Sequence, residues 1–134
     1  YSGLPIMDIR IFNYISETQD LSARFLVTDA IRAIRDRTVL MTSAERTVRD
    51  YLHARDFCAL IDAVLAAPPA NDVIDCYSKA PIEVSPARTG INATGRKPCY
   101  YSLNRRAGRF GYAPEFTSLA GVLDAVRAML AARA

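Results

Sequence analysis

The sequence is poor in the residues that define several common classes of protein. Its three cysteines, Cys58, Cys76 and Cys99, are an odd number without Cys-x-x-Cys spacing, so neither a disulfide framework nor a zinc site is indicated. No apolar run reaches the roughly 18 residues of a membrane-spanning helix. Lysine is limited to Lys79 and Lys97, and the net charge of +3 argues against a dedicated nucleic-acid binder. We therefore expect a soluble, cytoplasmic protein.

What the sequence does contain is enough apolar material for about one domain. It has 134 residues, of which 51% are hydrophobic, so a buried core is expected. Apolar and β-branched runs predict strands at 6–12, 38–41, 72–77 and 82–84. Helical spacing predicts a helix that starts near Asp20 or Ser22 and ends near Asp36, a helix from 57 to the Pro68-Pro69 pair, and a C-terminal helix packed through Leu119, Val122, Leu123, Val126 and Leu130. This alternation predicts an α/β fold.

Four segments carry a more specific pattern. Residues 8–13 read Asp-Ile-Arg-Ile-Phe-Asn, and residues 49–56 read Arg-Asp-Tyr-Leu-His-Ala-Arg-Asp. Residues 110–114 read Phe-Gly-Tyr-Ala-Pro, and residues 118–122 read Ser-Leu-Ala-Gly-Val. In this order they resemble the NAD-dependent epimerase/dehydratase family of extended short-chain dehydrogenases, whose members act on nucleotide-sugars. The resemblance covers nearly the whole chain.

The resemblance implies only the C-terminal portion of that Rossmann-type fold. Residues 1–13 would be a late strand of the parallel sheet, and residues 14–134 a small mixed α/β substrate-binding subdomain. The six glycines never take the Gly-x-Gly-x-x-Gly spacing of a dinucleotide-binding domain, and the family's catalytic Tyr-x-x-x-Lys pair has no counterpart. We therefore expect that the N-terminal dinucleotide-binding domain is absent from this chain, that the chain alone is inactive, and that its parent enzyme is a homodimer.

The resemblance also suggests site residues. Asn13, Arg49 and Arg96 correspond to positions that contact the pyrophosphate of the nucleotide-sugar. Phe12 corresponds to a residue near the nicotinamide of NAD or NADP. No catalytic residue is expected in this chain. From the residues themselves, a planar guanidinium suits an anionic ligand because it donates two parallel hydrogen bonds. Asp50 is expected to hold Arg49 or to cap local backbone.

Departures from the family pattern keep two alternatives open. No Gly-Pro follows Asn13, the turn at residues 42–45 has no glycine, and residues 85–95 are too few for the helix and strand that relatives have there. The lone histidine, His53, is expected to be structural rather than a general base. The main hypothesis is the substrate-binding part of a nucleotide-sugar epimerase or dehydratase. The alternatives are a non-catalytic binding module descended from it, or a reductase in the same family with a small substrate that lacks a nucleotide.

Overall fold

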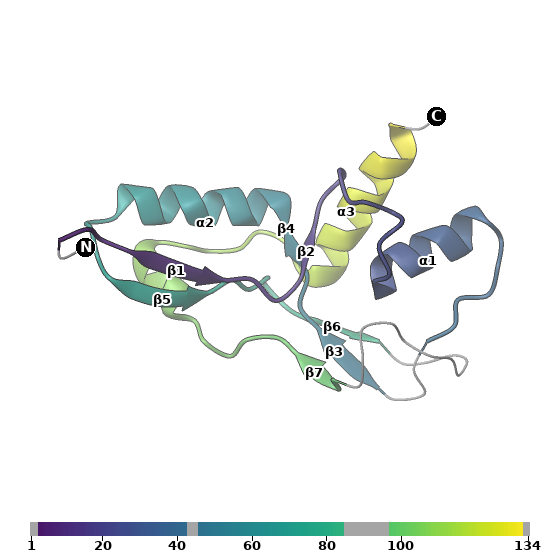
Figure 1. The fold of residues 1–134 in the computed structure, drawn as a ribbon, viewed down its shortest axis with the longest axis horizontal. Helices are drawn as coiled ribbons and strands as arrows, with labels where there is room; N and C mark the ends of the chain where they lie inside the picture. The colour runs from purple at the N-terminus through teal and green to yellow at the C-terminus, as the bar shows by residue number, and fades with distance from the viewer. Residues whose placement is uncertain (1–2, 43–45, 85–96, 133–134) are drawn as a thin grey trace.

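The computed structural model describes residues 3–42, 46–84 and 97–132, which form a mixed α/β arrangement (Figure 1). The strands are β1 (Met7–Arg10), β2 (Tyr14–Ile15), β3 (Thr47–Arg49), β4 (Leu52–His53), β5 (Asp72–Asp75), β6 (Ile82–Val84) and β7 (Cys99–Tyr100). The helices are α1 (Leu26–Arg35), α2 (Ala54–Ala66) and α3 (Ser118–Ala131), with a 3₁₀ helix η1 at Arg106–Phe110. The predicted α/β class is confirmed.

The strands form three small sheets. β1 pairs in parallel with β5, and β2 pairs in parallel with β4. β3 lies between β6, which is antiparallel to it, and β7, which is parallel. Parallel pairing requires a connection that crosses back, and the long connection from β1 to β5 includes α2. In Figure 1 α2 lies along the β1–β5 pair, whereas α1 and α3 lie at the other end of the molecule.

Two hydrophobic clusters stabilise these two ends. The first joins α1, α3 and the segment around β2, and its buried members are Ile15, Leu21, Val27, Ile31, Tyr51, Ala125 and Met129. The second lies between the β1–β5 pair, α2 and η1, and its buried members are Leu52, Leu60, Ile74, Cys76, Tyr77, Ala107 and Tyr112. The segment from β3 to β4 supplies Tyr51 to one cluster and Leu52 to the other, because successive side chains of an extended chain point to opposite faces.

Buried polar groups fix this central segment in place. The Asp50 carboxylate is 3% exposed and accepts hydrogen bonds from the Ser78 backbone N–H (3.2 Å) and the Ser118 hydroxyl (2.9 Å). The Tyr51 backbone N–H in turn donates to Ser118 Oγ at 2.8 Å. One carboxylate therefore ties together the connection after β3, the segment after β5 and the start of α3. Asp50 was expected to hold Arg49 or to cap local backbone, but its carboxylate instead binds the backbone N–H of Ser78, 28 positions away in the sequence.

His53 also has a structural position. It is 3% exposed, and its Nδ1 accepts a hydrogen bond from the Arg55 backbone N–H at 3.3 Å, which caps the start of α2. Its Nε2 lies 3.3 Å from an Asp124 carboxylate oxygen, and its ring packs against Phe116 with 4.1 Å between centroids. A Cβ on Gly121 would come within 3.1 Å of the His53 Cβ, so glycine allows α3 to approach β4 closely.

That close approach corrects the expected packing of the C-terminal helix. Leu119, Leu123 and Leu130 are 51%, 44% and 49% exposed, so the predicted stripe of large residues is only partly used. The buried face of α3 instead consists of Ser118, Gly121, Ala125 and Met129, with Val122 and Val126 partly buried beside it. Ser118, Gly121 and Ala125 have small side chains, which let the backbones of α3 and β4 pack more closely than leucines would allow.

Three further predictions were wrong in detail. Residues 38–41 form no strand, and Val39 and Met41 are 55% and 52% exposed. β-branched residues favour a strand only where their side chains can pack against neighbouring strands. The expected loop after Asn13 contains β2. The first long helix begins at Leu26, one turn later than predicted, and Phe25 and Ile34 are 51% and 71% exposed.

Candidate functional site

A cavity of 660 Å³ opens where the end of β1, the β3–β7 pair and the start of α1 meet. This is the size range of pockets that bind small molecules and cofactors. Its lining combines aromatic and aliphatic side chains with a few polar groups, which are Asn13, Gln19, Arg24, Thr28, Arg49 and Lys97. Three of the four site residues suggested by the sequence, Phe12, Asn13 and Arg49, lie in this one cavity. The fourth, Arg96, lies outside the described residues.

Arg49 occupies the last position of β3 and is 4% exposed. Its neighbours in register are Ile82 on β6 and Tyr100 on β7. The guanidinium Nη1 donates to the Val48 carbonyl at 3.0 Å and to the Pro98 carbonyl at 3.4 Å. Among the described residues it forms no ion pair with a carboxylate.

A buried guanidinium of this kind favours an anionic ligand. A guanidinium carries a positive charge, and a carbonyl oxygen satisfies one of its donors without cancelling that charge. Among the described residues, two carbonyls use part of its five N–H donors, which leaves other donors for groups in the cavity. The arrangement can therefore bind a phosphate or carboxylate group.

Asn13 stands beside Arg49 because the two segments exchange hydrogen bonds. The Asn13 Nδ2 donates to the Asp50 carbonyl at 2.8 Å, and the Leu52 backbone N–H donates to the Asn13 carbonyl at 2.9 Å. An amide –NH₂ carries two hydrogens, so one N–H remains after the bond to Asp50. Asn13 thus fixes the floor of the cavity and keeps a donor for a ligand.

Tyr51, which also lines the cavity, anchors this floor in the first hydrophobic cluster. It is 8% exposed. Burial raises the pKa of its hydroxyl, and the nearby Arg49 guanidinium offsets part of that rise. The hydroxyl therefore stays neutral near pH 7.

One wall of the cavity is aromatic and carries a cation. The Phe12 and Tyr100 rings meet edge to face with 5.3 Å between centroids, and the Lys97 Nζ lies 4.8 Å from the Tyr100 ring centroid. Phe12 follows β1, and parallel strands of open α/β sheets bind ligands beyond their carboxyl ends. Sequence reasoning missed Lys97 and Tyr100, although Lys97 directly follows the predicted Arg96.

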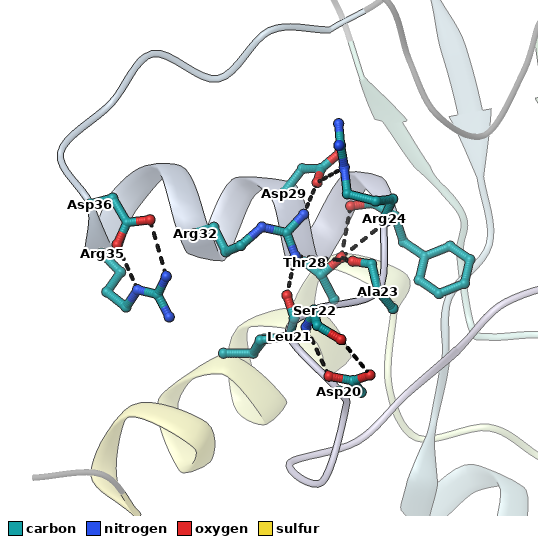
Figure 2. A network of polar contacts seen from close by, with 11 residues as sticks. Asp20, Leu21, Ser22, Ala23, Arg24, Thr28, Asp29, Arg32, Arg35 and Asp36 are labelled. Atoms are coloured by element: carbon teal, nitrogen blue, oxygen red, sulfur yellow. Dashed lines mark hydrogen bonds and ion pairs between the residues drawn. The ribbon is translucent and has the colours of Figure 1, made fainter.

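The other wall is the segment that leads into α1. Arg24, Phe25, Leu26, Val27 and Thr28 all line the cavity. Figure 2 shows how polar contacts from α1 hold the preceding turn. The Asp20 carboxylate accepts from the backbone N–H and the hydroxyl of Ser22, both at 2.8 Å, and the backbone bond, followed by the hydroxyl bond, lowers the pKa of that carboxyl. Asp20, predicted as a possible helix cap, therefore caps the turn at Ser22, which precedes α1.

Two residues of α1 act on the backbone of this wall. The Thr28 hydroxyl is within 2.5 Å of the Ala23 carbonyl and accepts from the Phe25 backbone N–H at 3.0 Å. The Arg32 guanidinium donates to the Leu21 and Ala23 carbonyls and pairs with Asp29 (Figure 2). The Leu21 and Ala23 carbonyls accept from side chains of α1, and the Phe25 carbonyl accepts the first intrahelical bond, from the Asp29 N–H at 2.8 Å, so the helix begins at Leu26. We call the bonds from the Arg32 guanidinium to the Leu21 carbonyl, the Ala23 carbonyl and Asp29 the Arg32 clamp.

The cavity lies in a mixed α/β protein of Rossmann type, beyond the carboxyl end of the parallel strand β1. The model of the NAD dependent epimerase/dehydratase family matches residues 1–76, so the chain belongs to that family. No curated protein matches it. Among the described residues, no helix is both long and apolar enough to cross a membrane.

Solved structures support the same fold at low sequence identity. A UDP-glucuronic acid 4-epimerase mutant from Bacillus cereus, solved with UDP-4-deoxy-4-fluoro-glucuronic acid and NAD, superposes with a TM-score of 0.76 at 14% identity over 96% of this chain and 46% of its own. A dTDP-glucose 4,6-dehydratase from Bacillus anthracis, with NAD, gives 0.74 at 18% identity over 97% and 46%. The Bordetella bronchiseptica enzyme WbmG, with NAD, gives 0.74 at 15% over 95% and 44%. The chain thus spans about half the length of these proteins.

Proposed function

We propose that this chain is the substrate-binding part of an NAD(P)-dependent nucleotide-sugar epimerase or dehydratase, and that Arg49 and Asn13 bind the pyrophosphate of the substrate. The observation that carries the proposal is the Arg49 guanidinium, buried without an ion pair among the described residues, in the same cavity as Asn13. A pyrophosphate carries two negative charges between two bulky groups. Fixed donors in a partly dry cavity bind such a charge strongly.

The two walls suit the groups on either side of a pyrophosphate. The α1 wall offers Phe25, Leu26 and Val27, which can pack against the flat face of a nucleobase. The opposite wall offers Phe12 and Tyr100. We assign the nucleoside to the α1 wall and the sugar to the aromatic wall, because the sugar must lie next to the nicotinamide for hydride transfer.

The residues present fit the nicotinamide end of a dinucleotide in one respect. The Phe12 ring follows the carboxyl end of the parallel strand β1 and borders the cavity, so it can pack against a flat ring placed there. When bound, NAD or NADP would accept and return a hydride. Proteins of similar fold were crystallised with NAD. We assign residues 1–13 to the sheet that carries the cofactor and residues 14–134 to the substrate subdomain.

Isothermal titration of the full protein with UDP-, CDP-, GDP- and dTDP-sugars tests this proposal. We expect one nucleotide series to bind and Arg49→Ala to weaken it at least about tenfold, since a charged hydrogen bond contributes roughly 1.5–3 kcal/mol. Arg49→Lys should recover only part of the affinity because an ammonium lacks the planar fork. Arg46→Ala is the matched control: Arg46 lies three positions earlier, is 69% exposed and pairs with Glu83 outside the cavity. Unchanged affinity in Arg49→Ala would refute the assignment.

A further inference from the structure

The cavity lining is electrostatically one-sided. Among the described residues, its lining contains the cations Arg24, Arg49 and Lys97 and no aspartate or glutamate. Arg24 has its Nε 3.2 Å from an Asp29 carboxylate oxygen that also pairs with Arg32, so two arginines share this one carboxylate. Arg49 is assigned above to the pyrophosphate. Lys97 remains, and it has no ion pair with any carboxylate in the described parts of the chain. Lys97 is exposed where it lines the cavity, so its charge is available to a bound ligand.

Contacts place Lys97 on the aromatic wall of the cavity, to which the proposed function assigns the sugar. Its Nζ lies 4.8 Å from the centroid of the Tyr100 ring, and that ring meets Phe12 at 5.3 Å. Phe12 is the residue assigned to the nicotinamide side. The sugar of a bound nucleotide-sugar would lie between the pyrophosphate at Arg49 and that side, so the ammonium of Lys97 would face the sugar.

A free ammonium at this position distinguishes between sugars. A neutral hexose offers only hydroxyl groups, and their hydrogen bonds to an ammonium largely replace bonds to water. A carboxylate offers a charge-assisted hydrogen bond, about twice as strong as a neutral one, to a lysine already positioned by an aromatic ring. Complementary charge then gives specificity for the acidic sugar.

We propose that the substrate is a nucleotide-uronate, a nucleotide-sugar whose sugar ring carries a carboxylate, and that Lys97 recognises this carboxylate. This inference rests on the proposed function, since it takes the position of the sugar from it. It adds the chemical class of the sugar and one specificity-determining residue. No bond is made or broken at Lys97, which acts by binding alone.

The test is isothermal titration of the full protein and its Lys97 variants with UDP-glucuronic acid and UDP-glucose, which differ by the carboxylate. We expect the wild type to bind UDP-glucuronic acid about tenfold more tightly. Lys97→Met should abolish this preference and leave UDP-glucose affinity unchanged, and Lys97→Arg should retain part of it. Lys79→Met, at the only other lysine, lies outside the cavity lining and should change nothing.

The outcomes separate the two proposals. Equal affinity of the wild type for both ligands overturns the inference about Lys97 but leaves the proposed function intact. So does an equal loss for both ligands in Lys97→Met, which would place Lys97 on the pyrophosphate. If the wild type binds neither of these ligands nor any CDP-, GDP- or dTDP-sugar, both proposals fail. The preference should also shrink between about 0.05 and 0.5 M salt because a partly exposed ion pair is screened, and a salt-independent preference would contradict a charge contact.

Discussion

The side-chain amide of Asn13 donates a hydrogen bond to the carbonyl of Asp50 across 2.8 Å. These residues are 37 positions apart. The bond connects the residue that precedes β2 to the residue that follows Arg49. The Leu52 backbone N–H completes the exchange by donating to the Asn13 carbonyl at 2.9 Å. The two residues proposed to bind pyrophosphate are therefore held together by the fold before any ligand arrives, which lowers the ordering cost of binding.

Replacing Asn13 by alanine should affect both stability and binding. The Asp50 carbonyl would lose its side-chain partner, and we expect a loss of roughly 1 kcal/mol in the free energy of unfolding. The ligand would lose a donor as well, so affinity for the nucleotide-sugar should fall several-fold. Urea unfolding and isothermal titration measure the two effects separately.

Asn71→Ala is the matched control for Asn13. The Asn71 Oδ1 accepts a hydrogen bond from the Ile6 backbone N–H at 2.7 Å, near the other end of β1 and outside the cavity lining. We expect this variant to lose some stability and to keep full affinity. An equal loss of affinity in both variants would mean that Asn13 acts only through the fold.

The Arg32 clamp should position the α1 wall of the cavity. Arg32→Met keeps the aliphatic length of the side chain but leaves the Leu21 and Ala23 carbonyls without their guanidinium partner. We expect a loss of roughly 1–2 kcal/mol in the free energy of unfolding, because a charged donor is removed from two partly buried carbonyls. The α1 wall is assigned to the nucleoside, so the affinity for the nucleoside monophosphate of the bound nucleotide series should fall. Binding of inorganic pyrophosphate, which needs only Arg49 and Asn13, should not change.

Arg35→Met provides the comparison on the same helix. Arg35 pairs with Asp36 at 2.7 Å, and both side chains are about half exposed, at 50% and 48%. Such surface pairs contribute little, so we expect less than about 0.5 kcal/mol and no change in affinity. The role assigned to Arg32 would be wrong if its variant weakened both ligands to the same extent.

Much of the fold could be predicted from local patterns. The spacing of Phe57, Leu60 and Val64 indicated α2, and Pro68-Pro69 indicated its end; the observed helix ends at Ala66. Three of the cavity residues, Phe12, Asn13 and Arg49, came from resemblance to a family, since no local pattern relates positions so far apart in the sequence.

The rest depended on contacts between distant residues. Nothing near Thr28 or Arg32 reveals that their side chains bind the backbone of residues 21–25 and delay the start of α1. The buried face of α3 follows from the closeness of Gly121 to His53, which a pattern of large apolar residues does not show. The position of the Lys97 ammonium over the Tyr100 ring likewise depends on the fold and is not evident from the sequence.

The three cysteines should differ sharply in reactivity. Cys58 and Cys99 are exposed, whereas Cys76 is 3% exposed in the second hydrophobic cluster. Burial, reinforced by the carboxylates of Asp75 and Asp50, raises the pKa of the Cys76 thiol to about 12. Because the thiolate is the reactive form, Cys76 should stay inert at pH 8 in the folded protein.

A disulfide reagent such as DTNB, applied at pH 8, checks this prediction. We expect two thiols to react in the native protein and three in guanidinium chloride, and in Cys76→Ala the native count should stay at two while the unfolded count falls to two. The raised pKa also sets the direction of a pH effect. Its stabilising contribution is complete below the ordinary thiol pKa and is lost as the pH rises toward 12, because only the unfolded chain ionises in that interval. Rapid native reaction of a third thiol would show that Cys76 is not in the core described here.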